Sequence, residues 1–406
     1  MVFALVIFRF GYAIYVPYVD TEALADVFKQ YSDTLLGYFN TLSGGGFSQA
    51  SIFALSVYPY INSSIIMQLL QVAIPALERM VKDGGEEGRK KLASITRYVT
   101  IALSLLMGWT YYIMLRTSGV LTRTDLWSAI VIILTFTAGS SFIMWLGEQI
   151  NSKGVGNGIS LILFASIVSR GPSAVMSIIN GLKSGSMNVI SVIVILVVAV
   201  AMIAFIVFIT NAERRIPIQY AKRMVGRKMY GGQSTHLPMK VNMPGVMPVI
   251  FASSIVTFPG TIIQFLNPEE GSFWSNFGKA FSQGSLAYII VYALLIVGFA
   301  YFYATIQFNP IEVSNNLKRN GGFIPGFRPG KPTTDFIAKV LNKITLMGAL
   351  FLGIVAILPL IMSNIKGLGG LAIGGTSVLI LVGVALETVK QIEAQMLMRH
   401  YKGFLE

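Results

Sequence analysis

The amino-acid sequence predicts an all-α membrane protein with ten transmembrane helices. Of its 406 residues, 54% are hydrophobic and only 12% are charged, which is about half the usual charged share of roughly 25% in soluble domains. The apolar residues also fall in long runs, and the run at 189–210 contains no charged residue. A helix needs about 20 apolar residues to cross a bilayer. Because a soluble globule of this size needs a more polar surface, we expect these runs to cross a membrane.

Ten segments are predicted as spans, and their order sets the topology. They lie at about residues 1–16, 60–77, 95–115, 127–147, 157–177, 189–210, 246–266, 285–307, 341–362 and 371–390. An even number of spans places both termini on one side of the membrane. Most of the 31 Lys and Arg residues lie in loops and span ends on that side. Basic residues are enriched in short cytoplasmic loops, so the sequence predicts a multi-pass protein of the cytoplasmic membrane with both termini cytoplasmic.

A short apolar segment at 44–58 lies between three glycines and Pro59. It is too short to cross the bilayer, and backbone at membrane depth must be buried in protein or line a wet cavity. We therefore expect a re-entrant half-helix inside the protein; the alternative is a short helix on the external surface. Gly44, Gly45 and Gly46 permit backbone conformations that other residues avoid, which suits a hinge for this segment.

Two predicted cytoplasmic loops, at about 211–245 and 308–340, are longer than a connection requires and are strongly basic. Their basic residues are Arg214, Arg215, Lys222, Arg223, Arg227, Lys228, Lys240, Lys318, Arg319, Arg328, Lys331 and Lys339. Such charge is often only a topology signal. These loops also contain turn-forming and apolar residues, however, and a structured basic protrusion is a docking surface for acidic protein or RNA phosphate.

The sequence offers little for catalysis or for binding a cofactor. It contains no cysteine, and neither His236 nor His400 lies in a cluster of acidic residues, so we expect no metal site. It has no phosphate-binding loop, and the glycine-rich stretch at 154–158 is interpreted as a tight turn before a span. We therefore predict no catalytic residue, no cofactor and no enzymatic activity.

Few ionisable residues occur inside the predicted spans, with Arg9 in the first span as the main exception. Ion-coupled carriers usually place such residues near the middle of the membrane, where ion binding or protonation is sensed. This weakens the alternative of an ion-coupled small-molecule secondary transporter without excluding it, because backbone carbonyls can also bind sodium.

Several ordered motifs occur along the sequence: YPYI at 58–61 with IIMQLL at 65–70, STHLPMKVNM at 234–243, NNLK at 315–318 with PGFRPG at 325–330, and GGTS at 374–377. Together they resemble the SecY family, which forms the channel of the bacterial Sec protein translocon. In chain order, they resemble its second span, its fourth and fifth cytoplasmic regions, and the start of its tenth span. Family members usually have an amphipathic segment before the first span, and because this sequence begins inside that span, we expect it to be shortened.

The resemblance implies an hourglass channel of two inverted five-helix halves. The N-terminal half covers 1–175 with the plug at about 44–58, a hinge loop covers 176–186, and the C-terminal half covers 187–406. It also implies a lateral gate that releases transmembrane segments into the membrane, while unfolded secretory proteins cross through the centre. The implied partners are the SecE and SecG subunits, the SecA ATPase, the ribosome, the secretory precursor with its signal peptide, and anionic membrane lipids. The motif positions further imply that Arg227, Lys228 and Arg328 contact the motor ATPase or the ribosome.

The resemblance also implies a waist ring of apolar side chains. The ring positions are Ile61, Ile65, Ile159, Leu163, Ile250 and Ile380. Two of these pairs have i,i+4 spacing, which places each pair on one helix face. Taken alone, such spacing more often marks lipid-facing or packing residues.

An accessory paralogue devoted to a few exported proteins is a further alternative. The many basic residues of the two long loops favour the general translocon channel over this paralogue.

Overall fold

The computed structural model of the chain describes residues 2–30, 40, 43–185, 188–220, 223–225, 228–230, 234–243, 245–266, 272–281, 285–363 and 375–402. The chain divides into two compact units. The first contains Met1–Val189, Thr257–Ser285 and Val384–Glu406, and the second contains Ile190–Val256 and Leu286–Gly383. The long helices α11 (Met247–Leu266) and α16 (Gly375–Lys402) contribute residues to both units.

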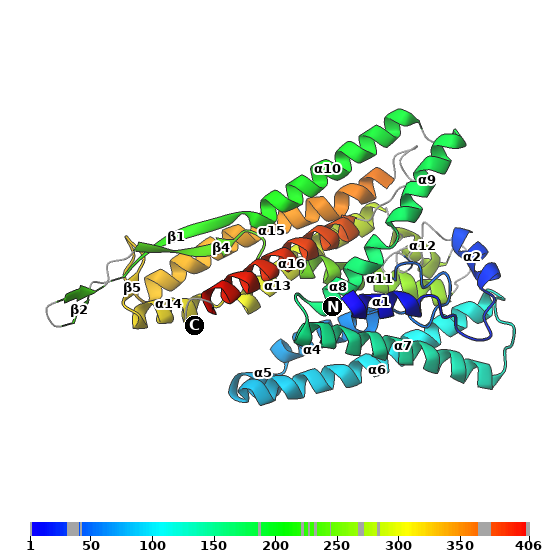
Figure 1. The fold of residues 1–406 in the computed structure, drawn as a ribbon, viewed down its shortest axis with the longest axis horizontal. Helices are drawn as coiled ribbons and strands as arrows, with labels where there is room; N and C mark the ends of the chain where they lie inside the picture. Colours follow the sequence, from blue (N-terminus) through cyan, green and yellow to red (C-terminus); the bar gives the residue numbers. More distant parts are fainter. Residues whose placement is uncertain are drawn as a thin grey trace. The chain divides into compact units, whose positions relative to one another are not determined.

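The first unit is helical in its described part (Figure 1). Its helices, besides parts of α11 and α16, are α1 (Val2–Gly11), α2 (Thr21–Gln30), α4 (Tyr58–Ala73), α5 (Pro75–Asp83), α6 (Gly85–Thr117), α7 (Leu126–Lys153), α8 (Gly158–Val168), α9 (Gly171–Lys183) and α12 (Phe273–Ala280). Helix α6 packs against α4, α5 and α7, and α7 packs against α8. Helices α4 and α5 meet at a bend of 102°. The bend follows from Pro75, which has no backbone N–H to continue the hydrogen-bond ladder of α4.

The second unit combines long apolar helices with a small sheet. Besides parts of α11 and α16, it contains α10 (Val189–Asn211, whose first residue belongs to the first unit), α13 (Leu286–Gln307), α14 (Pro310–Arg319) and α15 (Lys331–Ser363). Strands β1 (Glu213–Tyr220), β4 (Ser234–Lys240) and β5 (Gly322–Phe323) form an antiparallel sheet in the order β4-β1-β5. Strands β2 (Arg223–Val225) and β3 (Lys228–Tyr230) form a separate two-stranded ribbon. Helix α15 packs against both α13 and α14.

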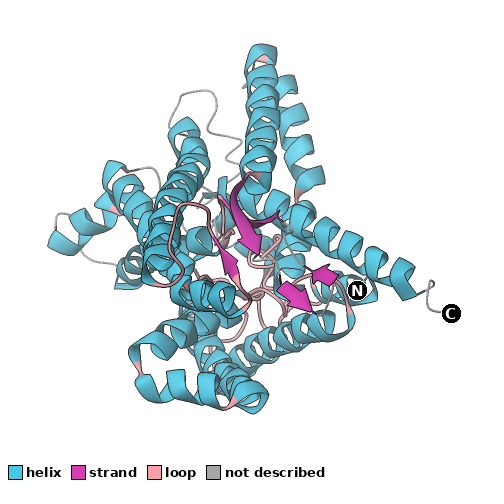
Figure 2. Ribbon diagram, turned by 90° about the vertical axis from the view of Figure 1, so that its left-hand side faces the viewer, coloured by secondary structure: helices cyan, strands magenta, loops and turns pink. Residues whose placement is uncertain are grey.

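The predicted helical class is confirmed, since helices make up most of the described chain (Figure 2). Each predicted span overlaps at least one helix. Within the described residues, six helices are long and apolar enough to cross a membrane, or seven if the bent pair α4 and α5 is one span. Helix α1 has only 10 described residues. The count of ten spans therefore remains a prediction.

Two sequence-based predictions of local structure are wrong. Residues 43–57 form consecutive turns rather than a half-helix. Gly44, Gly45, Ala50 and Ser56 have positive φ angles there, and each such angle breaks a right-handed helix. The predicted hinge loop at 176–186 is instead mostly helical, because α9 continues to Lys183.

Close contact between α7 and α8 depends on Gly158. A Cβ atom at this position would collide with the backbone carbonyl of Gly147 on α7. Gly158→Ala should therefore lower the free energy of unfolding of the purified protein by about 1–3 kcal/mol, the usual effect of overpacking, and with it the melting temperature. Gly298→Ala in α13 is the matched control, because a Cβ there meets no atom within 4 Å. Equal melting temperatures for the two variants would contradict this packing.

Candidate functional site

Helix α4 presents the first predicted ring pair, Ile61 and Ile65, which are 8% and 5% exposed. Its rotation is fixed by Ser63, whose hydroxyl donates a 2.7 Å hydrogen bond to the carbonyl oxygen of Thr96 on α6. At about 100° per residue, Ser63 lies on the opposite side of α4 from the isoleucine pair. The bond to α6 therefore turns Ile61 and Ile65 away from that helix.

Helix α8 presents the second predicted ring pair, Ile159 and Leu163, which are also buried. Asn157 caps the helix, because its side-chain oxygen accepts hydrogen bonds from the backbone N–H groups of Ile159 and Ser160 at 3.1 and 3.3 Å. Asn151 on α7 accepts a further bond from the Gly158 N–H at 2.7 Å. Side-chain caps of this kind stabilise a helix start by about 1 kcal/mol. The two asparagines therefore fix where α8 begins and how Ile159 is oriented.

The remaining ring residues belong to the second unit. Ile250 on α11 is half-buried, and Ile380 on α16 is 2% exposed. The two helices meet near these positions, since a Cβ on Gly383 would lie 2.7 Å from Cγ2 of Val246. Val246 is one turn before Ile250, and Gly383 is three residues after Ile380. The chain segments that carry Ile250 and Ile380 therefore approach each other within the second unit.

The predicted ring residues therefore form two helix-face pairs in the first unit, while Ile250 and Ile380 lie in the second. Their meeting in a single ring remains a prediction. Sequence reasoning missed the residues that hold these pairs, Ser63, Asn151 and Asn157. Of these, only Asn157 could have been identified from the sequence, because asparagine directly before an apolar run is a typical helix cap.

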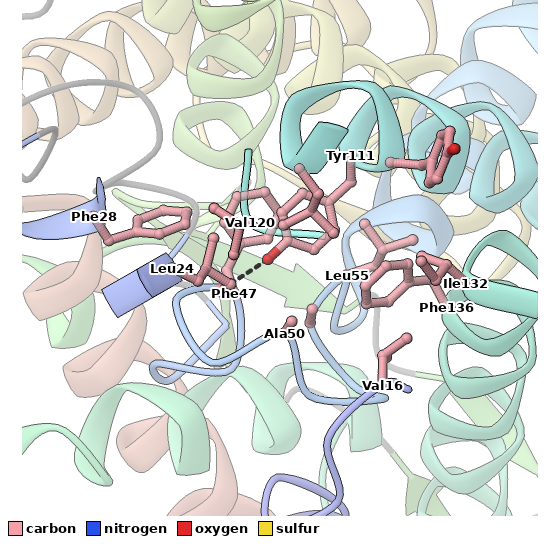
Figure 3. Packing of buried hydrophobic residues seen from close by; sticks show 13 residues of the cluster. Val16, Leu24, Phe28, Phe47, Ala50, Leu55, Tyr111, Val120, Ile132 and Phe136 are labelled. Carbon is pink, nitrogen blue, oxygen red and sulfur yellow. Dashed lines mark hydrogen bonds between the residues drawn. The ribbon is translucent and has the colours of Figure 1, made fainter. Parts of the chain in front are cut away.

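The predicted plug segment is packed into the core of the first unit. Phe47, Ala50, Ala54 and Leu55 join a buried cluster with residues of α2, α6 and α7, and Figure 3 shows their side chains together. Phe47 stacks on the ring of Tyr111 with 4.1 Å between centroids. The Tyr111 hydroxyl also donates a hydrogen bond to the backbone carbonyl of Phe47 (Figure 3). One tyrosine of α6 therefore holds the segment through both ring and hydroxyl.

The three glycines of the predicted plug hinge do different things. Gly44 and Gly45 have φ angles of 67° and 92°, in the left-handed region that favours glycine. Gly46 has no positive φ angle. A Cβ atom at this position would, however, collide with the ring of Tyr12 and lie 2.7 Å from Oγ of Ser51. The first two glycines thus permit the turn, and the third allows close packing.

Loss of the Tyr111 hydroxyl should loosen the plug segment. Tyr111→Phe removes the side-chain donor to the Phe47 carbonyl, which keeps its 3.3 Å bond from the Ala50 N–H, and losing one such hydrogen bond costs about 0.5–1.5 kcal/mol. If the segment seals a pore, reconstituted channels of this variant should leak more ions in the closed state, and a deletion within residues 47–54 should leak more still. Tyr112→Phe is the control, because its hydroxyl is not bonded to the segment in the described structure. Wild-type conductance in both altered proteins would show that the segment is only structural.

The two long basic loops fold together as one module in the second unit. Strand β1 lies between β4 and β5, so the first loop pairs directly with the second. Beneath the sheet is an apolar core of Ile216, Ile218, Met239, Leu317, Ile324, Ile337, Leu341 and Ile344. A core of this kind is not needed for a topology signal. The module instead displays its exposed basic residues on a defined surface.

Arg328 is exposed at the tip of a rigid turn in this module. Its carbonyl accepts a 2.8 Å hydrogen bond from the Thr333 hydroxyl. The ring centroids of Phe327 and Phe336 lie 4.2 Å apart, so the residue before Arg328 is packed. Gly326 and Gly330 have φ angles of 87° and 108°, which form the turn on either side of Arg328. In the described part of the chain no acidic side chain pairs with Arg328, so its guanidinium is presented to solvent.

The other two predicted docking residues are less well defined. Arg227 lies outside the described residues. The backbone of Lys228 begins strand β3, and its side chain also lies outside the described part. In the sequence, the two-stranded ribbon β2–β3 lies between strands β1 and β4 of the main sheet.

Comparison with known proteins assigns the chain to a family. The family model described as SecY matches residues 51–389. The chain is 42% identical to the protein translocase subunit SecY of Thermotoga maritima over 99% of this chain and 93% of the relative. It is also 42% identical to the SecY subunits of Streptomyces coelicolor and Mycobacterium tuberculosis, over 99% of this chain and 94% of each relative.

Solved structures of protein-conducting channels share the fold. A structure of such a channel matches with a TM-score of 0.67 at 19% identity, covering 97% of this chain and 90% of that one. A SecY structure whose plug domain stabilises the closed channel matches at 0.68 and 18%, with the same coverage. Sec61 in the canine ribosome-channel complex matches at 0.65 and 17%, again with that coverage. With the family model matching most of the chain and relatives 42% identical over nearly all of it, this chain belongs to the SecY family.

Proposed function

We propose that this chain is the protein-conducting channel of a bacterial Sec translocon, passing unfolded secretory proteins across the cytoplasmic membrane and releasing transmembrane segments sideways. The observation that carries the proposal is the 42% identity, over nearly the whole chain, to proteins named as SecY translocase subunits. The helical membrane fold and the channel structures that share it are consistent with this function. An ion-coupled small-molecule carrier has no support among these relatives.

The proposed seal has two parts, an apolar ring and a plug. The ring consists of the buried pairs on α4 and α8 together with Ile250 and Ile380. An apolar constriction closes by dewetting. A translocating chain of any sequence passes it easily, because aliphatic side chains offer no hydrogen bonds that would hold the chain. The segment at 43–57 closes the external side and swings out about Gly44 and Gly45.

The proposed partners follow from the basic module. The surface around Arg328 receives the SecA ATPase or the ribosome, with Arg227 and Lys228 contributing. An exposed guanidinium on a rigid turn suits acidic protein and RNA phosphate alike. The SecE and SecG subunits, the signal peptide of the precursor and anionic lipids complete the set, with both termini in the cytoplasm. The chain itself hydrolyses nothing, so the energy comes from these partners.

Reconstitution tests this function directly. The full chain is placed in vesicles with its small subunits and the motor ATPase, and a secretory precursor is added outside. We expect ATP-dependent protection of the precursor from added protease. The absence of protection, together with substrate-dependent ion flux through the isolated chain, would contradict the channel and favour a carrier.

A further inference from the structure

The short helix α12 (Phe273–Ala280) carries an aromatic face that the channel function does not use. Phe273, Trp274, Phe277 and Phe281 form a continuous row of ring contacts, with centroids 4.7–6.4 Å apart along the helix. Phe273 is 73% exposed and Trp274 is 52% exposed. An exposed aromatic cluster of this kind is unusual on a surface that faces only water.

One residue of α12 fixes the direction of this face. A Cβ on Gly278 would lie 2.7 Å from Cγ2 of Ile263 on α11, and Ile263 is buried. Gly278 therefore lies against α11, with a helical offset of about 100° from Phe277. Trp274 lies one turn before Gly278 on nearly the same helix face, yet it is 52% exposed, so the contact with α11 leaves Trp274 accessible.

The position of α12 in the chain indicates what covers the aromatic face. The helix connects the apolar helices α11 and α13, on the side that the predicted topology places outside the cell. The first residue of α13, Leu286, is 76% exposed, and Trp127 near the start of α7 is 68% exposed, on the same predicted side. Tryptophan and other aromatic residues are enriched at the level of the lipid headgroups. The aromatic face thus lies where spanning helices enter the membrane.

We propose that α12 is an interfacial helix whose aromatic face is seated in the external leaflet, at the boundary between lipid headgroups and acyl chains. Short amphipathic helices bind this boundary through buried apolar area. Through the contact between Gly278 and Ile263, the membrane surface then holds the external end of α11, the helix that carries Ile250. The lipid surface is in this way a binding partner that positions α11.

Trp274 fluorescence in lipid vesicles tests the proposal. The chain has four tryptophans, so replacing Trp109, Trp127 and Trp145 by Phe leaves Trp274 as the reporter in the full chain. We expect strong quenching by lipids brominated near the headgroup, weaker quenching by lipids brominated near the acyl-chain end, and little quenching by aqueous iodide. The control is the variant that retains only Trp109, an exposed residue within α6, which should respond more to the deeper bromine.

Two outcomes would overturn the proposal. Strong quenching by iodide without quenching by brominated lipid would place α12 in water. Protection from both quenchers would mean that protein, whether a second copy or a small subunit, covers the aromatic face. Gly278→Leu should also change the ratio of shallow to deep quenching, because the larger side chain pushes α12 away from α11.

Discussion

Replacing Ile380 by Asn is expected to make the channel accept precursors with defective signal sequences and to increase its ion leak. Ile380 is 2% exposed and is proposed to line the waist. A buried amide without a partner costs roughly 1–3 kcal/mol, and this cost falls on the closed, dry state. It is relieved when the pore wets or opens, so the closed–open equilibrium should shift toward open by up to about 5–150-fold.

Selection for export of a signal-defective reporter measures this effect. Ile354→Asn on α15 is the matched control, because it makes the same exchange at a side chain that is 54% exposed. The control should leave substrate selectivity unchanged. If Ile380→Asn only lowers the amount of folded protein and export stays selective, Ile380 packs without lining the pore.

Reversing the charge of Arg328 should abolish motor-driven export while leaving the protein folded. The side chain is exposed and the turn is held by backbone and Thr333 contacts that Glu would preserve. Losing one member of a desolvated charge pair costs about 2–5 kcal/mol, which corresponds to a loss of affinity of roughly 30-fold or more. Because Glu also repels an acidic partner, the loss of binding free energy should lie at the upper end of the range of about 2–5 kcal/mol.

Export assays with purified motor, combined with a binding measurement, test this expectation. Lys183→Glu on α9 provides the control, since it reverses an exposed charge on the predicted external side, away from the motor. The control should export normally. Normal export by Arg328→Glu would remove this residue from the docking surface.

Each predicted span overlaps a helix, because each has a long apolar run, a signal that needs no knowledge of neighbouring helices. That all ten cross the membrane remains a prediction. Sequence reasoning failed on the plug segment, because its turns depend on positive φ angles at Ala50 and Ser56, residue types that rarely adopt them. It also predicted a loop at 176–186, where α9 continues to Lys183. No residue of α9 is buried. Its serines, asparagine and glycines resemble a loop by composition.

The residues of the candidate site remain predictions, and the sequence supplies only part of what positions them. Spacing and motif identified the apolar pairs, and burial of Ile61, Ile65, Ile159 and Leu163 agrees with a place inside the protein. The sequence could not show that Ser63 turns α4 through a bond to α6, since that partner is far away in the chain. Nor could it show that the two basic loops share one sheet, which depends on pairing between β1 and β5.

Disulfide capture of an arrested precursor tests the central claim most directly. The chain has no cysteine, so single variants Ile61→Cys and Ile380→Cys each report on one position. A precursor halted midway, with one cysteine in the segment inside the channel, should form a disulfide with both. Val197→Cys, at a side chain of α10 that is 58% exposed, should form none. Capture at Val197 as efficient as at the other two positions, or no capture at Ile61 and Ile380, would contradict a polypeptide path through this ring.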